Sequence, residues 1–190
     1  MTPNPLPSIE YLNEALEYCE DSPSKLKWRK RPRSHFTTER GYKINLSRDA
    51  GRNAGSKGKS GDGTEFWAIK INQVRYPLHR VVWAIFNGRD PGEFEVDHKD
   101  GNCLNNNHEN LRIANRQENA CNRGSNKNGT SKHKGVCFEK RTQKWYVQIK
   151  FGSKNNYLGR FECEEDARDA YDAAAVKYHG EFARTSANKP

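Results

Sequence analysis

A polar segment, GSNKNGTSKHKG at residues 124–135, limits what this chain can fold into. Gly, Ser, Asn and Lys dominate it and apolar residues do not recur in it, so it cannot contribute to a packed core. Of the 190 residues, 33% are hydrophobic and 30% are charged, which argues against one large core. Aromatic residues at 11% argue against wholesale disorder. The sequence therefore predicts a domain at residues 1–123, a linker at 124–131 and a second domain at 132–190.

Positive charge is spread along the whole chain. The net charge is +9 and the isoelectric point is near 9.3. Residues 131–190 hold 12 Lys and Arg against 8 Asp and Glu, so +4 of the excess lies there and +5 lies before them. An extended partner such as nucleic acid fits this spread better than a point ligand does. A soluble protein that happens to be basic remains the alternative.

The cysteines are odd in number and widely spaced: Cys19, Cys103, Cys121, Cys137 and Cys163. Because there is no C-x-x-C pair, we expect neither a structural zinc site nor a disulfide framework. No segment resembles a signal peptide, and no apolar run approaches membrane-spanning length. We therefore expect a cytoplasmic protein with reduced thiols, without a membrane partner or a small-molecule cofactor.

The first domain shows several helix and strand patterns. Apolar spacing from Ile9 predicts a short acidic amphipathic helix that continues to Cys19 or Glu20. Residues 41–46 alternate like a strand, and residues 47–63 are so rich in Gly, Ser and Lys that a mobile loop is expected. Residues 66–71 predict a strand that turns at Asn72–Gln73 into a hairpin. Residues 78–88 then switch to helical spacing, with Pro77 before them and Gly88 at their end.

A basic run, KLKWRKRPR, occupies residues 25–33 and places six basic side chains around Trp28. These side chains could bind phosphates, or the run could be the solvated edge of a strand. The sequence leaves both readings open. The candidates for phosphate contacts are Lys27, Arg29 and Arg31.

Residues 94–123 predict a unit of two strands and one helix. FEVDH reads as a strand that ends before an Asp-Gly turn, and LRIA (111–114) reads as a second strand. Asn115 with Glu118 three residues later resembles a capping box and predicts the start of a helix. Asn119 and Asn122 would share one face of that helix.

The second domain predicts a sheet packed on one helix. In WYVQIKF (145–151), alternate residues face opposite sides, and NYLGRF follows after a turn as another strand. Residues 164–179 predict a helix with acids in its first turn, Gly180 at its end and an alanine-rich face. A three-stranded antiparallel sheet on this helix would leave its other face open. The expected fold class of the whole chain is α+β.

The pair Asp97-His98 carries the candidate chemistry. Phosphodiester hydrolysis needs an activated water and neutralised phosphate charge, and a histidine with a divalent cation can supply both. Adjacent strand residues point to opposite sides, which assigns a metal ion to Asp97 and the water to His98. An amide oxygen from Asn119 would complement the carboxylate for Mg²⁺, with Mn²⁺ as another possible ion. Asn110 would cross-bond the loop after His98. Weaker candidates are His79, Arg80 and Asn122.

The segment VDHKDGN…NN…ENLR…QEN resembles the HNH (ββα-metal) endonucleases, in the His-Asn-Asn variant of phage and intron-associated enzymes. The resemblance implies a ββα-metal core at about residues 94–123. It makes His98 the general base, Asn110 the central structural Asn, and Asp97 with Asn119 the metal ligands. WRKRP, GYKI and LHRVVWAIFNG also resemble the upstream part of that family.

Nearly all of residues 131–187 is similar to the Apetala-two (ethylene-response-factor) DNA-binding domain, through SKHKGV, KWYVQIKF, NNYLGRF and EEDARDAYDAAAVKYHGEFA. Those domains lay a three-stranded sheet in the major groove of double-stranded DNA. Plant versions place Glu and Arg on the middle strand, where this chain has Gln148 and Lys150, so base preference does not carry over. The candidate DNA-binding residues are Lys134, Arg141, Lys144, Tyr146, Gln148, Lys150 and Tyr157.

Together these features predict a magnesium-dependent DNA endonuclease positioned by a sequence-reading domain. The resemblance is to free-standing phage homing endonucleases, which implies 5′-phosphate and 3′-hydroxyl ends and a phage-encoded protein acting in a bacterial cytoplasm. The alternative is a DNA-binding transcriptional regulator whose HNH-like unit is not catalytic. The sequence leaves open the oligomeric state and whether one strand or two are cut.

Overall fold

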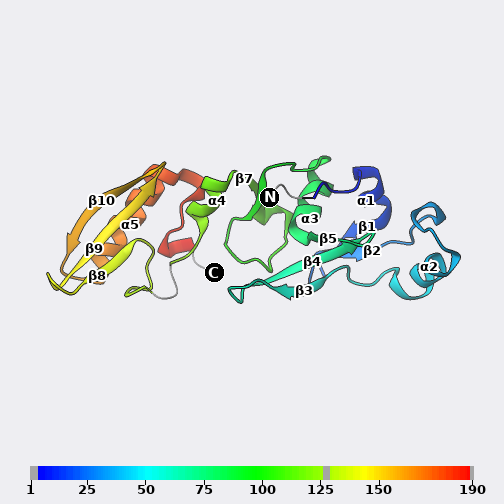
Figure 1. Ribbon diagram of the computed structural model, residues 1–190, viewed down its shortest axis with the longest axis horizontal. Helices are drawn as coiled ribbons and strands as arrows, with labels where there is room; N and C mark the ends of the chain where they lie inside the picture. The colour runs from blue at the N-terminus through cyan, green and yellow to red at the C-terminus, as the bar shows by residue number, and fades with distance from the viewer. Residues whose placement is uncertain (1–3, 126–128, 189–190) are drawn as a thin grey trace. The chain divides into compact units, whose positions relative to one another are not determined.

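Packing divides the chain into two compact units. The structure, a computed structural model, describes residues 4–125 and 129–188. We name the units by their position in the chain (Figure 1). The N-terminal unit consists of Met1–His98 and Asn102–Ile113, and the C-terminal unit of Lys99–Gly101 and Ala114–Pro190. Both combine helices with small antiparallel sheets, so the α+β expectation is confirmed at this level.

The N-terminal unit contains three helices and three small sheets among the described residues. Its elements are, in chain order, α1 (Ile9–Ala15), β1 (Leu16–Tyr18), β2 (Leu26–Trp28), α2 (Glu39–Ile44), β3 (Ser56–Lys59), β4 (Glu65–Ile71), β5 (Val74–Pro77), α3 (Leu78–Asn87), β6 (Glu95–His98) and β7 (Leu111–Ala114). Strands β1 and β2 pair, β3, β4 and β5 form a sheet in that order, and β6 pairs with β7. Short 3-10 or π turns lie at Arg33–His35, Asn45–Asp49 and His108–Asn110.

The prediction of one helix from Ile9 to residue 19 or 20 is wrong. Helix α1 ends at Ala15, and the next residue, Leu16, begins β1 opposite Trp28 of β2. Leu16 is 1% exposed and Leu26 is completely buried. Because both a helix and this strand pair would bury Leu16, its spacing alone could not distinguish them.

The strand predicted at residues 41–46 is also wrong. Thr38 caps α2 by accepting a hydrogen bond from the Gly41 amide at 3.1 Å, and a π turn continues to Asp49. The completely buried Asn45 explains this choice, since its Oδ1 accepts from the backbone N–H of Arg31 at 3.0 Å. A tertiary bond to a distant backbone group therefore overrides the local alternation.

Part of the predicted loop at residues 47–63 is a strand, because β3 occupies Ser56–Lys59. Strand β3 pairs antiparallel with β4 as the edge of the three-stranded sheet. Gly58 lies opposite Phe66, and a side chain there would meet the Arg75 guanidinium, because a Cβ would lie 2.4 Å from Arg75 Nη2. The arginine instead lies over the Phe66 ring, with 5.6 Å between Cζ and the ring centroid. The glycine that suggested a loop thus makes room for a cation–π contact.

The hairpin and the helix that follow it are confirmed. Asn72 and Gln73 connect β4 to β5 with φ of 49° and 67°, as a tight hairpin turn requires. Helix α3 begins after Pro77 and ends at Gly88, whose φ is 65°. The core of the unit gathers mainly around α3 and β4, with Leu12, Leu26, Ile69, Ile71, Leu78, Val81, Val82 and Ala84 each at most 1% exposed.

The C-terminal unit contains the three-stranded sheet and long helix that were predicted. Its elements are α4 (Arg116–Asn122), β8 (Val136–Glu139), β9 (Lys144–Phe151), β10 (Lys154–Phe161), α5 (Glu164–His179) and 3-10 turns at Gly180–Phe182 and Ser186–Asn188. The antiparallel order is β10-β9-β8. Val147 and Ile149 of β9 pack with Ala167, Tyr171 and Ala175 of α5. Phe151, at the end of β9, is 51% exposed, and its ring lies 5.2 Å from that of Tyr178 of α5 between centroids.

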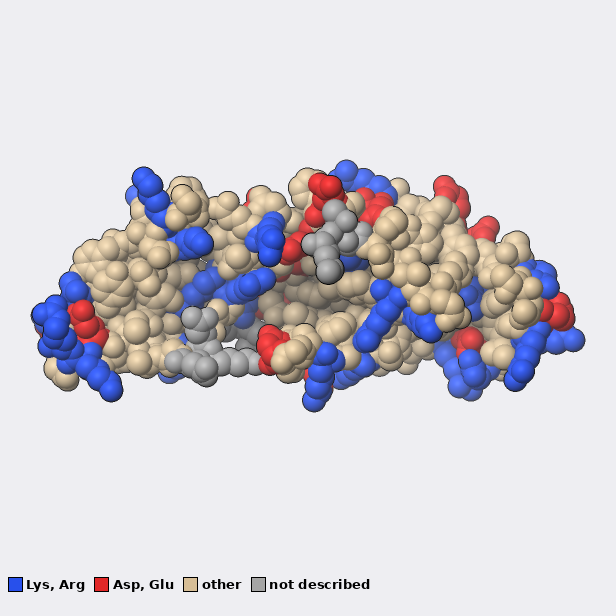
Figure 2. Space-filling view, viewed as in Figure 1, with Lys and Arg blue, Asp and Glu red and all other residues tan. Residues whose placement is uncertain are grey.

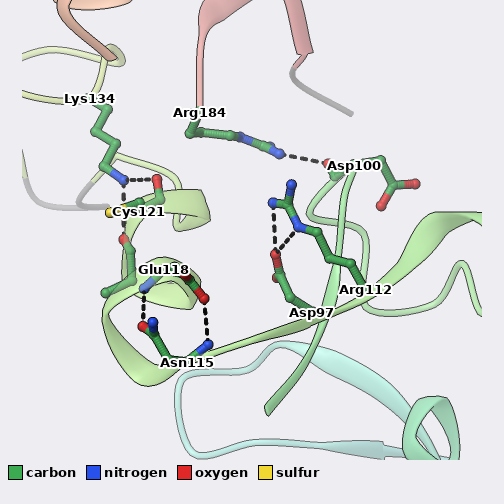
Figure 3. Close-up of polar contacts among 9 residues, drawn as sticks. Asp97, Asp100, Arg112, Asn115, Glu118, Cys121, Lys134 and Arg184 are labelled. Atoms are coloured by element: carbon green, nitrogen blue, oxygen red, sulfur yellow. Dashed lines mark hydrogen bonds and ion pairs between the residues drawn. The ribbon is translucent and has the colours of Figure 1, made fainter. Parts of the chain in front are cut away.

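Packing assigns α4 to the C-terminal unit, ahead of the linker predicted at residues 124–131. The Lys134 ammonium donates to the Ala120 carbonyl at 3.3 Å and to the Cys121 carbonyl at 2.6 Å, so it holds the end of α4 (Figure 3). Residues 126–128 of that linker lie outside the described residues. Among the residues that are described, no helix is long and apolar enough to cross a membrane.

Removing the cap of α4 gives a test of local stability. The Asn115 side chain accepts from the amides of Gln117 and Glu118 at 2.9 Å each, and Glu118 Oε2 accepts from the Asn115 amide at 2.7 Å (Figure 3). Asn115→Ala is expected to lower the free energy of unfolding by about 1 kcal/mol, because two helical N–H groups lose their acceptor. Urea unfolding followed by circular dichroism measures this. Asn115→Asp keeps the cap oxygen and should stay near wild type; an equal loss in both variants would contradict this explanation.

Candidate active site

Asp97, in β6, is a buried carboxylate with an arginine partner. It is 8% exposed, and its Oδ2 accepts from Arg112 Nε at 3.1 Å and from Nη2 at 2.9 Å (Figure 3). Arg112 comes from β7, the strand that pairs with β6. A buried carboxylate needs such compensation to remain charged. The sequence analysis missed Arg112, because it predicted the two strands but not the register between them.

His98 is buried and oriented by an amide. It is 5% exposed, and its Nε2 lies 3.0 Å from Oδ1 of Asn106, which is itself 1% exposed. An amide oxygen only accepts hydrogen bonds, so Nε2 carries the proton. A neutral imidazole in this tautomer has its lone pair on Nδ1, and that atom can take a proton from water. Asn106 was also missed; the only signal was its place in the Asn-rich run that follows His98.

Asn110 ties down the loop that holds Asn106. Its Nδ2 donates to the carbonyl of Asn105 at 2.9 Å, so it bonds to the loop after His98 in the expected place. Asn107 caps the 3-10 turn that contains Asn110, since its Oδ1 accepts from the Glu109 amide at 3.0 Å. Asn107 and Asn110 therefore stabilise the loop whose Asn106 side chain bonds to His98.

Two weaker candidates lie on α3. The His79 ring packs edge to face on His98, with 5.0 Å between centroids. Burial, and to a smaller extent the nearby His98 and Arg80, lower the pKa of His79 to about 3, so His79 is neutral. Arg80 is 5% exposed and donates to Asp90 Oδ1 and to the carbonyls of Gly92 and Phe94. Arg80 thus holds a loop in place, and its guanidinium is engaged there.

The structure gathers Asp97, His98, His79 and Asn110 in the N-terminal unit, whereas Asn119 and Asn122 lie on α4 in the C-terminal unit. Among the described residues, no three His, Cys, Asp or Glu side chains are grouped so that they could hold a metal ion. Asp97 is a hard oxygen donor, and Mg²⁺ often takes one or two carboxylates and keeps several waters. The residues present thus fit Mg²⁺ in donor chemistry.

The basic run around Trp28 has structural partners. Arg29 Nε donates to the Leu16 carbonyl at 2.9 Å. The Arg31 guanidinium lies over two rings, 4.7 Å from the centroid of Trp28 and 4.4 Å from that of Phe36. Lys27 lies on β2 itself. Strand β2 supports the strand-edge reading, and phosphate contacts by these residues remain a prediction.

The face of the C-terminal sheet away from α5 carries polar and aromatic side chains. Gln148 and Lys150 are exposed there, and the rings of Tyr146 and Tyr157 stack with 5.2 Å between centroids. Arg160, which the sequence analysis missed, lies over both rings at 5.6 and 5.7 Å. It also pairs with Glu139 at 2.8 Å, and this contact is the main reason that the pKa of Glu139 falls to about 2.

The other residues predicted to bind DNA differ in their surroundings. Lys144 pairs with Glu162 at 2.7 Å, and Arg141 lies in the turn between β8 and β9. Lys134 is half-buried, with its ammonium on the end of α4 rather than projecting into solvent. On the face seen in Figure 2, Lys and Arg side chains are distributed over both units.

Comparisons with known proteins bear on both halves of the chain. A family model described as HNH endonuclease matches residues 76–121, which include Asp97, His98, Asn110 and Asn119. The chain is 33% identical to an uncharacterized HNH endonuclease of Acanthamoeba polyphaga mimivirus over 127 residues, 66% of this chain and 63% of that protein. It is 40% identical over 60 residues to an ethylene-responsive transcription factor of Arabidopsis thaliana, 30% of this chain but only 14% of that protein. No solved structure matches.

The similarity to one phage protein extends over most of that relative. The chain is 34% identical to Protein 3.8 of Escherichia phage T7 over 113 residues, which are 56% of this chain and 87% of the phage protein. This chain therefore belongs to the same family as Protein 3.8 of phage T7, and it carries an HNH endonuclease domain.

Proposed function

We propose that this protein is a metal-dependent DNA endonuclease whose general base is His98. The observation that carries the proposal is the hydrogen bond from His98 to the buried Asn106, within the segment that the HNH endonuclease model matches. That bond leaves Nδ1 as the basic atom of a neutral imidazole. A base held in one tautomer needs no rearrangement before it takes a proton from the attacking water.

Asp97 and Asn119 are the proposed ligands of the ion. A bound Mg²⁺ would neutralise phosphate charge and stabilise the leaving oxygen. Asp97 would offer its carboxylate from β6, where Arg112 fixes the position of Oδ2. Asn110 would keep the loop of Asn106 in place and so keep His98 aimed. Hydrolysis by this arrangement would leave 5′-phosphate and 3′-hydroxyl ends.

The C-terminal sheet is proposed to place the nuclease on double-stranded DNA. Its open face offers Gln148 and Lys150 as base or phosphate contacts and the stacked pair Tyr146–Tyr157 as a rigid aromatic surface. The similarity to plant ethylene-responsive factors over 60 residues supports this role. A second binding module raises the local concentration of the first on DNA without altering its chemistry.

A phage homing-type nuclease is the specific form that we propose, because the relatives include phage and viral proteins. A DNA-binding regulator without cleavage activity is the second candidate, and the similarity to transcription factors favours it. The two candidates differ in one measurable property, which is turnover of DNA in the presence of magnesium.

Incubation of supercoiled plasmid and phage genomic DNA with the full chain tests the proposal. With Mg²⁺ or Mn²⁺ we expect nicked or linear product, and with EDTA we expect none. End mapping of the products should give 5′-phosphates at a limited set of sites. DNA binding without product in either metal would refute the nuclease and favour the regulator.

A further inference from the structure

A positively charged pocket of about 240 Å³ lies within the C-terminal unit. Its side-chain walls include His133, Lys134, Arg168, Tyr171, Asp172 and Arg184. Three of these residues are permanently or normally cationic, and one is an acid. We call it the Arg184 pocket. Of the candidate site residues discussed so far, only Lys134 lines this pocket.

Arg184 is the residue that most needs a ligand. It is 8% exposed, and its Nη1 donates to the carbonyl of Asp100 at 2.7 Å (Figure 3). Its Nε is buried and has no hydrogen-bond partner among the described residues. A guanidinium keeps its charge at any ordinary pH, and a buried donor without an acceptor costs about 1–3 kcal/mol. An acceptor that enters the pocket would remove this cost.

Acidic groups offset part of the positive charge of the pocket, but fewer acids than cations line it. The Asp172 carboxylate accepts hydrogen bonds from the amide and the hydroxyl of Ser186, and Arg168 pairs with Asp169 at 2.7 Å. Lys134 is half-buried, and its ammonium adds positive charge although it donates to the Ala120 and Cys121 carbonyls. Its pKa is lowered to about 8, first by burial and also by the positive charges of Arg184 and Arg123. Like charges held this close repel each other unless an anion lies between them.

We infer that the Arg184 pocket binds a phosphate group, either a backbone phosphate of DNA or free phosphate. The tetrahedral group offers several acceptor oxygens and more than one negative charge, which suits a pocket lined by Lys134, Arg168 and Arg184. A water occupies about 30 Å³ of liquid, so the pocket has room for such an anion with a few waters. For DNA the inference rests on the proposed function, whereas for free phosphate it does not.

Two variants remove a pocket cation, and one matched variant removes a cation elsewhere on the same unit. Arg184→Gln removes the buried guanidinium, and Arg168→Gln removes a half-buried one whose loss should be easier for the fold to tolerate. Lys177→Gln removes an exposed charge of α5 that does not line the pocket. Thermal unfolding of the full chain is followed during titration with inorganic phosphate, against sodium chloride at equal ionic strength. Affinity for a DNA duplex is measured at several salt concentrations.

We expect phosphate to raise the unfolding midpoint of wild type and Lys177→Gln, but not of the two pocket variants. If DNA supplies the phosphate, the slope of log affinity against log salt should also fall by about 1 in the pocket variants relative to Lys177→Gln. A response in either assay supports the site and identifies its source. If neither assay separates Arg168→Gln from Lys177→Gln, the inference is overturned. The phosphate titration involves no cleavage, so failure of the proposed nuclease would not change its result.

Discussion

His98→Ala is expected to reduce the rate of magnesium-dependent DNA cleavage by about 10²–10⁴-fold, the usual contribution of a general base. The variant removes the imidazole that Asn106 orients and that is proposed to take the proton of the attacking water. The affinity for DNA should remain close to that of wild type, because a 5% exposed imidazole offers little surface to a partner. Single-turnover cleavage of plasmid and anisotropy binding to a labelled duplex measure the two quantities separately.

Two comparisons make the result specific. His35→Ala removes an imidazole from the same unit, where His35 stacks on Tyr11, and should cleave at nearly the wild-type rate. Asn106→Ala leaves His98 in place but removes its orienting acceptor, so cleavage should slow and its pH profile should shift. Full activity in His98→Ala would exclude this histidine as the base, even if cleavage needs magnesium.

Gly135→Ala is expected to lower the free energy of unfolding of the C-terminal unit by about 3 kcal/mol or more. The φ of Gly135 is 71°, which costs an L-residue about 1–2 kcal/mol. An added Cβ would also lie 2.3 Å from ring atoms of Tyr171 and 2.4 Å from the Gln148 carbonyl oxygen. Tyr171 is 3% exposed in the centre of the core, and overpacking there costs roughly 1–3 kcal/mol.

Gly152→Ala separates the two effects. Gly152 has a similar φ of 61°, but nothing lies within 4 Å of its added Cβ. This variant should therefore show only the backbone cost of about 1–2 kcal/mol. Guanidinium unfolding followed by fluorescence of Trp145, with the other tryptophans replaced, reports on this unit. If both variants lower the free energy of unfolding equally, the structure has relaxed to avoid the contact between the added Cβ at position 135 and Tyr171.

The sequence predicted the elements whose signals are local and agree with one another. Helix α5 combines acids in its first turn with an alanine face, and the Asn72–Gln73 turn lies between two clear strands. Prediction from the sequence failed where a group distant in the chain determines the backbone conformation. Asn45 is held by the amide of Arg31, and β3 exists because β4 offers it an edge. Neither partner is visible in a local window of sequence.

The candidate site divides in the same way. Asp97, His98 and Asn110 could be chosen as candidates from residue type and spacing, because few side chains can bind a divalent cation or take a proton from water. Asn106 and Arg112 could not, because their roles depend on the path of a loop and on the register of β6 against β7. The contact of Arg184 could not be predicted either, because its partner Asp100 lies 84 residues away in the sequence.

The bonds from Lys134 to the end of α4 have a consequence for how such proteins can recombine. A crossover in the polar stretch at residues 124–131 would appear neutral, because apolar residues do not recur in it. It would, however, replace Lys134 by the donor's residue, and without a lysine there the last carbonyls of α4 would lose the ammonium that binds them. Chimeras that exchange the C-terminal sheet should therefore either include α4 in the exchanged piece or retain a lysine at position 134.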